Sequence, residues 1–176
     1  MPDTQLTNPA AQDNEVWGTA QTIEEYVYWS TAATPPNLQN GQIVQVVGGG
    51  SYSGGIFTPS GSPGSVTSAL LPYIAPITNT SVGFKAIGVV TNAPTGGYTN
   101  GSVVQVVTKG MTAVLVQGTS SAIGNVVTDT TTSALPGVGS ISATVVAAGS
   151  NLGVCYTVAT LSTTAGTLIY AYINQF

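Results

Sequence analysis

One stretch, residues 100–118, constrains the fold of this chain more than any other: NGSVVQVVTKGMTAVLVQG. Two runs rich in β-branched residues, 102–108 and 111–117, flank the pair formed by Lys109 and Gly110. A short connection that contains glycine between two such runs is typical of a β-hairpin. The stretch therefore predicts two antiparallel strands that turn at Lys109 and Gly110. Nothing in it is chemically reactive, which favours a scaffold over an enzyme.

Similar runs recur along the chain, separated by clusters of Gly, Pro, Asn, Ser and Thr. This pattern is typical of a β-sandwich or barrel. The sequence thus predicts an all-β protein: a small antiparallel β-barrel or β-sandwich with an extended N-terminal arm. Glycine-rich residues 48–55 and 59–64 are expected to be loops, and 66–77 at most a short helical turn before Pro72. The other expected strands are 22–29, 40–47, 84–91, 124–129, 140–147, 152–160 and 167–173.

The chain also echoes itself in two places. The segment NGQIVQVV at residues 40–47 returns as NGSVVQVV at residues 100–107. A second echo pairs GV at 88–89 and GSVV at 101–104 with GV at 153–154 and GTLI at 166–169, and in both copies the two glycines are 13 residues apart (101 − 88; 166 − 153). Because its internal spacing is kept, the second echo predicts two similar strand–loop–strand units that pack as one barrel.

Charged residues make up only 5% of the 176 residues, against about 25% in an average soluble protein. Hydrophobic residues make up 43%, which is ample for a core. With two lysines and a net charge of −4, binding to nucleic acid is not expected. The start of the sequence lacks the basic region and following apolar stretch that would predict a signal peptide. No apolar run approaches the ~20 residues of a membrane span. We expect the chain to be made in the cytoplasm.

The sequence offers few groups for catalysis. It has no histidine, which removes the usual general base and the commonest metal ligand. Glu24 and Glu25 are adjacent and would point to opposite faces of a strand, while Asp129 has no acidic neighbour. Cys155, the single cysteine, lies in an apolar run that predicts a core position. We therefore expect no enzymatic activity, no cofactor and no metal site.

Three parts of the chain differ in composition. Residues 1–35 are predicted to form an N-terminal arm, 36–83 a loop-rich β segment that is an insertion or a small lobe, and 84–176 the barrel or sandwich domain. The arm is rich in aromatic residues, which either pack in the core or dock on a neighbouring subunit; both interpretations stay open. These candidate contacts are Trp17, Tyr26, Tyr28 and Trp29.

From residue 84 onward the order of the pieces resembles the phage head-decoration, or capsid cement, proteins. The resemblance rests on AIGVV at 86–90, GSVVQVV at 101–107 and KGMTAVLV at 109–116, and continues with IGNVV, LGVC and GTLIYAYI further on. It implies a β-barrel or sandwich on the outer surface of an icosahedral capsid, often as a homotrimer. The implied partner is the major capsid protein, with the arm as the strap, so that a chain without residues 1–35 should fold but bind capsids weakly.

Other functions fit the same sequence. A tail, fibre or coat protein of a virion would have the same strands rich in Gly, Ser and Thr. A carbohydrate-binding β-sandwich would use exposed tyrosines such as Tyr52, Tyr73 and Tyr98 to stack on sugars. In each case the chain acts by binding and by being a structural part.

Overall fold

The computed structural model describes residues 20–30, 32–53, 56–60, 71–77, 86–128, 135–144 and 151–174, with the backbone alone for 48–53, 56–60 and 71. These residues contain strands and no helix, which confirms the predicted all-β class. The strands are β1 (Thr22–Tyr28), β2 (Ile43–Ser53), β3 (Ile56–Ser60), β4 (Leu71–Pro76), β5 (Ala86–Thr91), β6 (Val103–Gln117), β7 (Ser120–Ser121), β8 (Val126–Thr128), β9 (Gly139–Ser142), β10 (Asn151–Cys155), β11 (Ala159–Thr160) and β12 (Thr167–Asn174).

The hydrogen-bonded strands close into two rings that share β6. In the first ring, which we call the N-terminal barrel, the order is β1-β4-β2-β5-β6, and β6 pairs back to β1. In the second ring, the C-terminal barrel, the order is β6-β12-β10-β8-β9, and β9 pairs back to β6. Closure removes the free strand edges that an open sheet would expose. β3 pairs with β2 outside the first ring, and β7 pairs with β11 beside the second.

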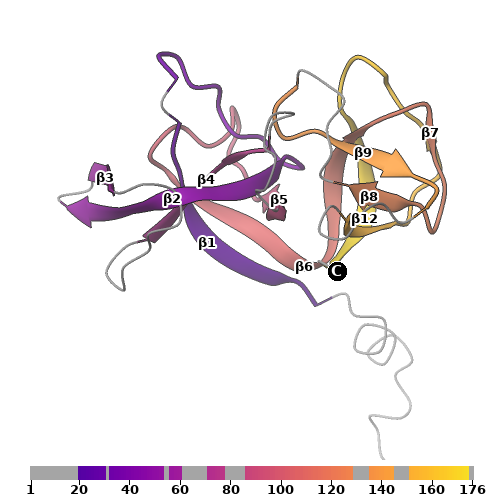
Figure 1. The fold of residues 1–176 in the computed structure, drawn as a ribbon, viewed down its shortest axis with the longest axis horizontal. Coiled ribbons are helices and arrows are strands. Elements are labelled where there is room, and N and C mark those ends of the chain that lie inside the picture. The colour runs from indigo at the N-terminus through magenta and orange to yellow at the C-terminus, as the bar shows by residue number, and fades with distance from the viewer. Residues whose placement is uncertain are drawn as a thin grey trace, which may run out of the picture.

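The predicted hairpin at residues 102–117 is wrong, because these residues form one continuous strand. Figure 1 shows β6 running from the N-terminal half of the molecule into the C-terminal half. Its residues 103–109 pair with β1, whereas residues 109–116 pair with β12. Gly110 does have a positive φ of +110°, as a turn would need, but here it lies where β6 changes partners. The conformation that Gly110 adopts is thus one that favours glycine, but it marks a change of partner strand within β6 and not a turn.

The two barrels have the same topology and the same register. β1, β2, β4, β5 and the first half of β6 correspond to the second half of β6, β8, β9, β10 and β12. In both barrels the first and third of these strands are parallel and every other pairing is antiparallel. Val89 pairs with Val107, and 65 residues later Val154 pairs with Tyr172. The chain is therefore a tandem repeat in which one strand ends the first unit and begins the second.

Loop geometry repeats as well. The N–H of Gly41 donates to the carbonyl of Val90 (2.9 Å), and that of Gly124 donates to the carbonyl of Cys155 (2.9 Å). Both glycines have a positive φ, +85° and +89°. The second echo in the sequence thus marks the true repeat, although its two units lie in separate barrels and not in one. The first echo does not, because the counterpart of Asn40 is residue 123.

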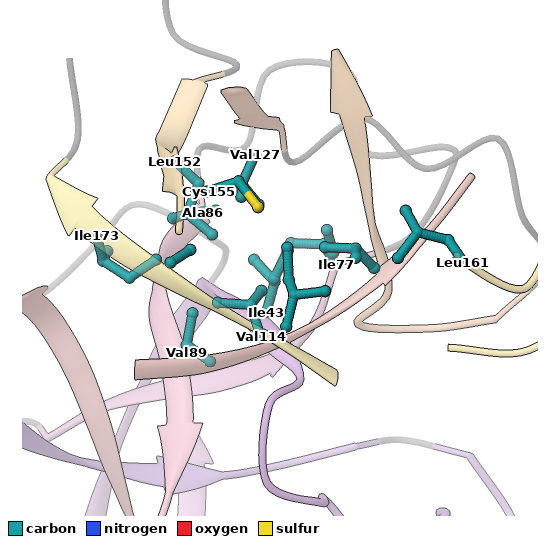
Figure 2. Close-up of a cluster of buried hydrophobic side chains, with 13 residues drawn as sticks. Ile43, Ile77, Ala86, Val89, Val114, Val127, Leu152, Cys155, Leu161 and Ile173 are labelled. Atoms are coloured by element: carbon teal, nitrogen blue, oxygen red, sulfur yellow. The ribbon is translucent and has the colours of Figure 1, made fainter. Parts of the chain in front are cut away.

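Each barrel has its own apolar interior, and the N-terminal half adds side chains to the second. The N-terminal core comprises Tyr28, Leu38, Val44, Ile74, Val90, Val104 and Val106. The C-terminal core includes Val114, Val127, Leu152 and Cys155, and Ile43, Ile77 and Val89 join it from the N-terminal half (Figure 2). An added Cβ at Gly139 would lie 2.6 Å from Cδ1 of Ile43, so this glycine makes room for that side chain. The two halves are packed as one body.

The strands do not follow the predicted division into residues 1–35, 36–83 and 84–176. Residues 22–28, assigned to the arm, form β1 inside the N-terminal barrel, and residues 71–76 form β4. Residues 48–53, expected as a loop, continue β2, and residues 59 and 60, also expected as a loop, are the end of β3. The prolines at 72 and 76 lie within β4, opposite Gly49 and Val44 of β2.

Candidate interaction surface

The described residues contain no group of three or more His, Cys, Asp or Glu side chains that could hold a metal ion. Cys155 is buried, as predicted, and its Sγ donates to the carbonyl of Thr157 at 3.1 Å. Within the described part of the chain, no helix is long and apolar enough to cross a membrane.

Of the four candidate contacts from the sequence, one is buried and two are half-buried. Tyr28 is only 1% exposed, and its hydroxyl donates to the carbonyl of Pro36 at 2.7 Å. Tyr26 packs against the same core, half-buried. Trp29 is half-buried after β1, and Trp17 lies outside the described residues. Tyr28 is thus a core residue and is withdrawn from the candidate contacts, because an alternating strand that closes a barrel must turn one face inward.

The two tyrosines of β1 are held in the neutral form. Burial raises the pKa of Tyr26, and the hydrogen bond to Glu24 (2.5 Å) and the negative charge of that carboxylate raise it further. Burial also raises the pKa of Tyr28, while hydrogen bonding with Ser30 lowers it by less. Both hydroxyls therefore act as structural hydrogen-bond donors.

Among the side chains that the structure describes, the most exposed aromatic ones lie on the outer face of the C-terminal barrel. On β12 the residues alternate, so that Ile169 and Ala171 enter the core while Tyr170 is 63% exposed. Tyr156, which follows β10, is 53% exposed, and its N–H donates to the carbonyl of Tyr170 at 2.8 Å. The two tyrosines are therefore cross-strand neighbours on one face. We call them the tyrosine pair.

Backbone contacts fix the position of the tyrosine pair. The N–H of Tyr170 donates to Oγ1 of Thr157 at 2.8 Å. The N–H of Thr157 in turn donates to Sγ of the buried Cys155 at 3.4 Å. Two exposed rings held by a closed barrel lose little conformational freedom when a partner covers them. This arrangement suits binding to another protein surface.

A second exposed apolar group lies beside the tyrosine pair. Ile123 is 67% exposed, and the next residue, Gly124, donates its N–H to the carbonyl of Cys155, which precedes Tyr156. Val158, two residues beyond Tyr156, is 73% exposed. We call Ile123, Gly124 and Val158 the loop face. Together the two groups form the main apolar surface of the described part of the C-terminal barrel.

Sequence reasoning did not find this surface. β12 carries apolar residues on both faces, LIYAYI, and such a strand is indistinguishable from one buried on both sides until its neighbours are known. The tyrosines named as sugar-stacking candidates lie elsewhere. Tyr98 is half-buried against the N-terminal core, with its hydroxyl directed to the carbonyl of Asn92 (3.0 Å). Tyr73 is half-buried on β4, and the side chain of Tyr52 lies outside the description.

Comparison with known proteins does not identify the chain. A scan against protein-family models finds no match, and a search of curated proteins finds none either. The tyrosine pair and the loop face are therefore interpreted from their own geometry.

Proposed function

We propose that this chain is a structural protein of a bacteriophage virion, which decorates the capsid and stabilises it by bridging major capsid protein subunits on the outer surface. It acts by binding, not as an enzyme, and uses no cofactor or metal. It is made in the host cytoplasm and joins the virion as a homo-oligomer, a trimer. Neither nucleic acid nor membrane is its direct partner.

The observation that carries the proposal is the tyrosine pair on a rigid barrel of very low charge. Aromatic anchors dominate the energetics of protein interfaces. Tyr156 and Tyr170 are the exposed aromatic neighbours, and no charged residue of the described sequence follows Lys109. A partner can therefore cover this face without removing ions from water, which would oppose binding.

The repeat supports the bridging role. A protein that joins two identical neighbours benefits from two related contact surfaces, because linked contacts reinforce each other. The outer face of β1 and the first half of β6, which carries the exposed Ile23, is the counterpart of the outer face of β6 and β12. One chain thus presents two related faces, joined by the shared strand.

The test is reconstitution on capsids that lack this protein, read out by electron microscopy. The wild-type chain should add density at symmetry-related sites, and Tyr156→Ser/Tyr170→Ser should add much less at the same concentration. Leu135→Thr serves as the matched control, because Leu135 is an exposed apolar residue away from β10 and β12. Bare shells with the wild-type chain would overturn the proposal, and full occupancy by the double variant would remove the tyrosine pair from it.

The arm is tested separately in the same assay. Deletion of residues 1–35 would remove β1, including the buried Val27 and Tyr28, and so confound binding with folding. Deletion of residues 1–19 removes Trp17 and keeps β1. Reduced occupancy by this shorter chain, with unchanged thermal stability, would assign a capsid contact to the arm.

Two alternatives give different outcomes. A tail, fibre or coat protein should assemble by itself into tubes or shells, without a preformed lattice. Carbohydrate binding is favoured by the tyrosine pair, since neighbouring exposed rings can stack on sugars. A glycan array with the wild-type chain and Tyr156→Ser/Tyr170→Ser distinguishes it: retained, tyrosine-dependent glycan binding would replace the capsid proposal.

A further inference from the structure

Within one chain, the N-terminal barrel docks on the C-terminal barrel through the loop before β2. The carbonyl of Gly41 accepts a hydrogen bond from the N–H of Leu115 (2.8 Å), and the N–H of Ile43 donates to the carbonyl of Gly137 (2.8 Å). An added Cβ at Gly41 would lie 2.5 Å from the Leu168 side chain. The loop is therefore pressed against β6 and β12 of the second barrel.

This contact is heterologous, because two related barrels use different faces. The first barrel contributes the loop before β2, and the second contributes the outer face where Leu115 of β6 pairs with Leu168 of β12. Since the chain is a repeat, it holds a second version of each face. The loop before β8 corresponds to the docking loop, and the pair Val27 and Val103 corresponds to the receiving pair.

The second docking loop is the loop face, and it is uncovered. Gly124, the counterpart of Gly41, has nothing within 4 Å of an added Cβ. Asn40 in the first loop accepts a hydrogen bond at Oδ1 from the N–H of Ala93 (2.7 Å). At the corresponding positions stand Ile123 and Val158, both largely exposed. An internal polar contact of the first unit is thus replaced by exposed apolar side chains in the second.

The second receiving face is also open in part. Val103, the counterpart of Leu168, is 47% exposed, close to the 54% of Leu168 beside the docked loop. Gly101, the counterpart of Gly166, has nothing within 4 Å of an added Cβ. Val27, the counterpart of Leu115, is buried and pairs with both Tyr73 and Val103, so the accessible receiving face is narrower than the internal one and consists of Val103 and Gly101.

We propose that copies of this chain associate head to tail, the loop face of one copy docking on the Val103 face of the next. The internal contact between the barrels is the template for the loop side of this interface; on the receiving side β4 already pairs with Val27, so the contact is confined to Val103 and Gly101. A heterologous contact of this kind either closes into a ring or extends into a filament, depending on the rotation between neighbours. The proposal concerns the chain alone and stands whether or not the chain decorates a capsid.

The test uses the full chain without any partner, in sedimentation velocity over a range of concentrations. Ile123→Asn/Val158→Ala gives the loop face the residues of its counterpart in the first unit. Val103→Lys places a charge on the receiving face. Each variant alone should raise the dissociation constant by about tenfold or more. Leu135→Thr, at an exposed apolar residue on neither of the two faces, is the control that should leave association unchanged. Thermal unfolding verifies that every variant is folded.

Mixing the two variants is the deciding experiment. Each retains the face that the other lacks, so an equimolar mixture should form a 1:1 dimer and no larger species. Self-association of the Val103→Lys chain at wild-type strength would show that the loop face pairs with itself, and would overturn the head-to-tail contact. A monomeric wild-type chain at all concentrations, or a mixture that stays monomeric while the wild type associates, would also overturn it.

Discussion

Substitution of Gly110 by alanine probes the point where β6 passes from one barrel to the other. An added Cβ there would lie 2.7 Å from the carbonyl oxygen of Ala20 and 2.9 Å from Cα of Gln21, closer than real Cβ atoms approach. The φ of +110° also disfavours any residue with a side chain. We assign about 1–2 kcal/mol to the backbone conformation and about 1–3 kcal/mol to displacing the neighbouring chain.

Alanine also lowers the conformational entropy of the unfolded chain, which offsets the loss in stability by about 0.4–1 kcal/mol. The expected net loss in free energy of unfolding is therefore about 1–5 kcal/mol, a large share of the ~5–15 kcal/mol typical of a domain. The assay is urea unfolding followed by circular dichroism, with the midpoint and slope fitted together. The Gly110→Ala variant should keep the wild-type slope.

Gly124→Ala is the matched control for this prediction. Its φ of +89° carries a similar conformational cost, but nothing lies within 4 Å of an added Cβ. Gly110→Ala should therefore lose about 1–3 kcal/mol more than Gly124→Ala. Equal losses, within about 0.5 kcal/mol, would refute the reasoning, because a tight turn at Gly110 away from residues 20 and 21 would behave in that way.

Three further predictions concern the repeat and the tyrosines of β1. Gly88→Ala and Gly153→Ala, whose added Cβ atoms would lie 2.4 and 2.2 Å from carbonyl oxygens of the neighbouring strand, should destabilise the fold to a similar degree in urea unfolding; a loss in one alone would contradict the equivalence of the barrels. Tyr28→Phe should cost about 1 kcal/mol in the same assay through the lost hydrogen bond to Pro36. The raised pKa values of Tyr26 and Tyr28 mean that the folded state holds these protons more tightly than the unfolded state, so their contribution is complete below the ordinary pKa of 10.0 and is lost as pH rises above it. The urea midpoint of the wild-type chain should fall as the pH rises above about 10, and that of Tyr26→Phe/Tyr28→Phe should fall less. A wild-type midpoint that does not change with pH in this range would contradict the raised pKa values.

Composition and local pattern predicted the strands well and their partners poorly. The all-β class, the strand at 167–173 and the buried Cys155 follow from alternation and β-branched runs, which are local properties. The tandem repeat was visible in the spacing of glycines, because Gly88 and Gly153 each face a carbonyl oxygen of the next strand that a side chain would strike. Such a steric requirement leaves a direct trace in sequence.

The shared strand left a misleading trace. A glycine with positive φ between two β-branched runs is the local signature of a hairpin, and Gly110 has that conformation. What decides between a turn and a continuing strand is the neighbour: residues 20 and 21 cross at Gly110, and the partner changes from β1 to β12. These partners are distant in sequence, so no local pattern could specify them. The exposed tyrosine pair escaped notice for the same reason.

The shared strand also ties the stability of the two barrels together. β6 supplies a wall to both, and the C-terminal core is completed by Ile43 and Ile77 from the N-terminal half. Unfolding the first barrel would withdraw both side chains and leave Gly139 facing a cavity, at a cost of several kcal/mol for two large aliphatic groups. The second barrel is therefore not expected to persist alone. Urea unfolding of a Trp17→Phe chain should show one transition, coincident for the fluorescence of Trp29, which directly follows β1, and for the reactivity of Cys155 in the second core. Separate transitions for these two probes would show that the barrels are independent units.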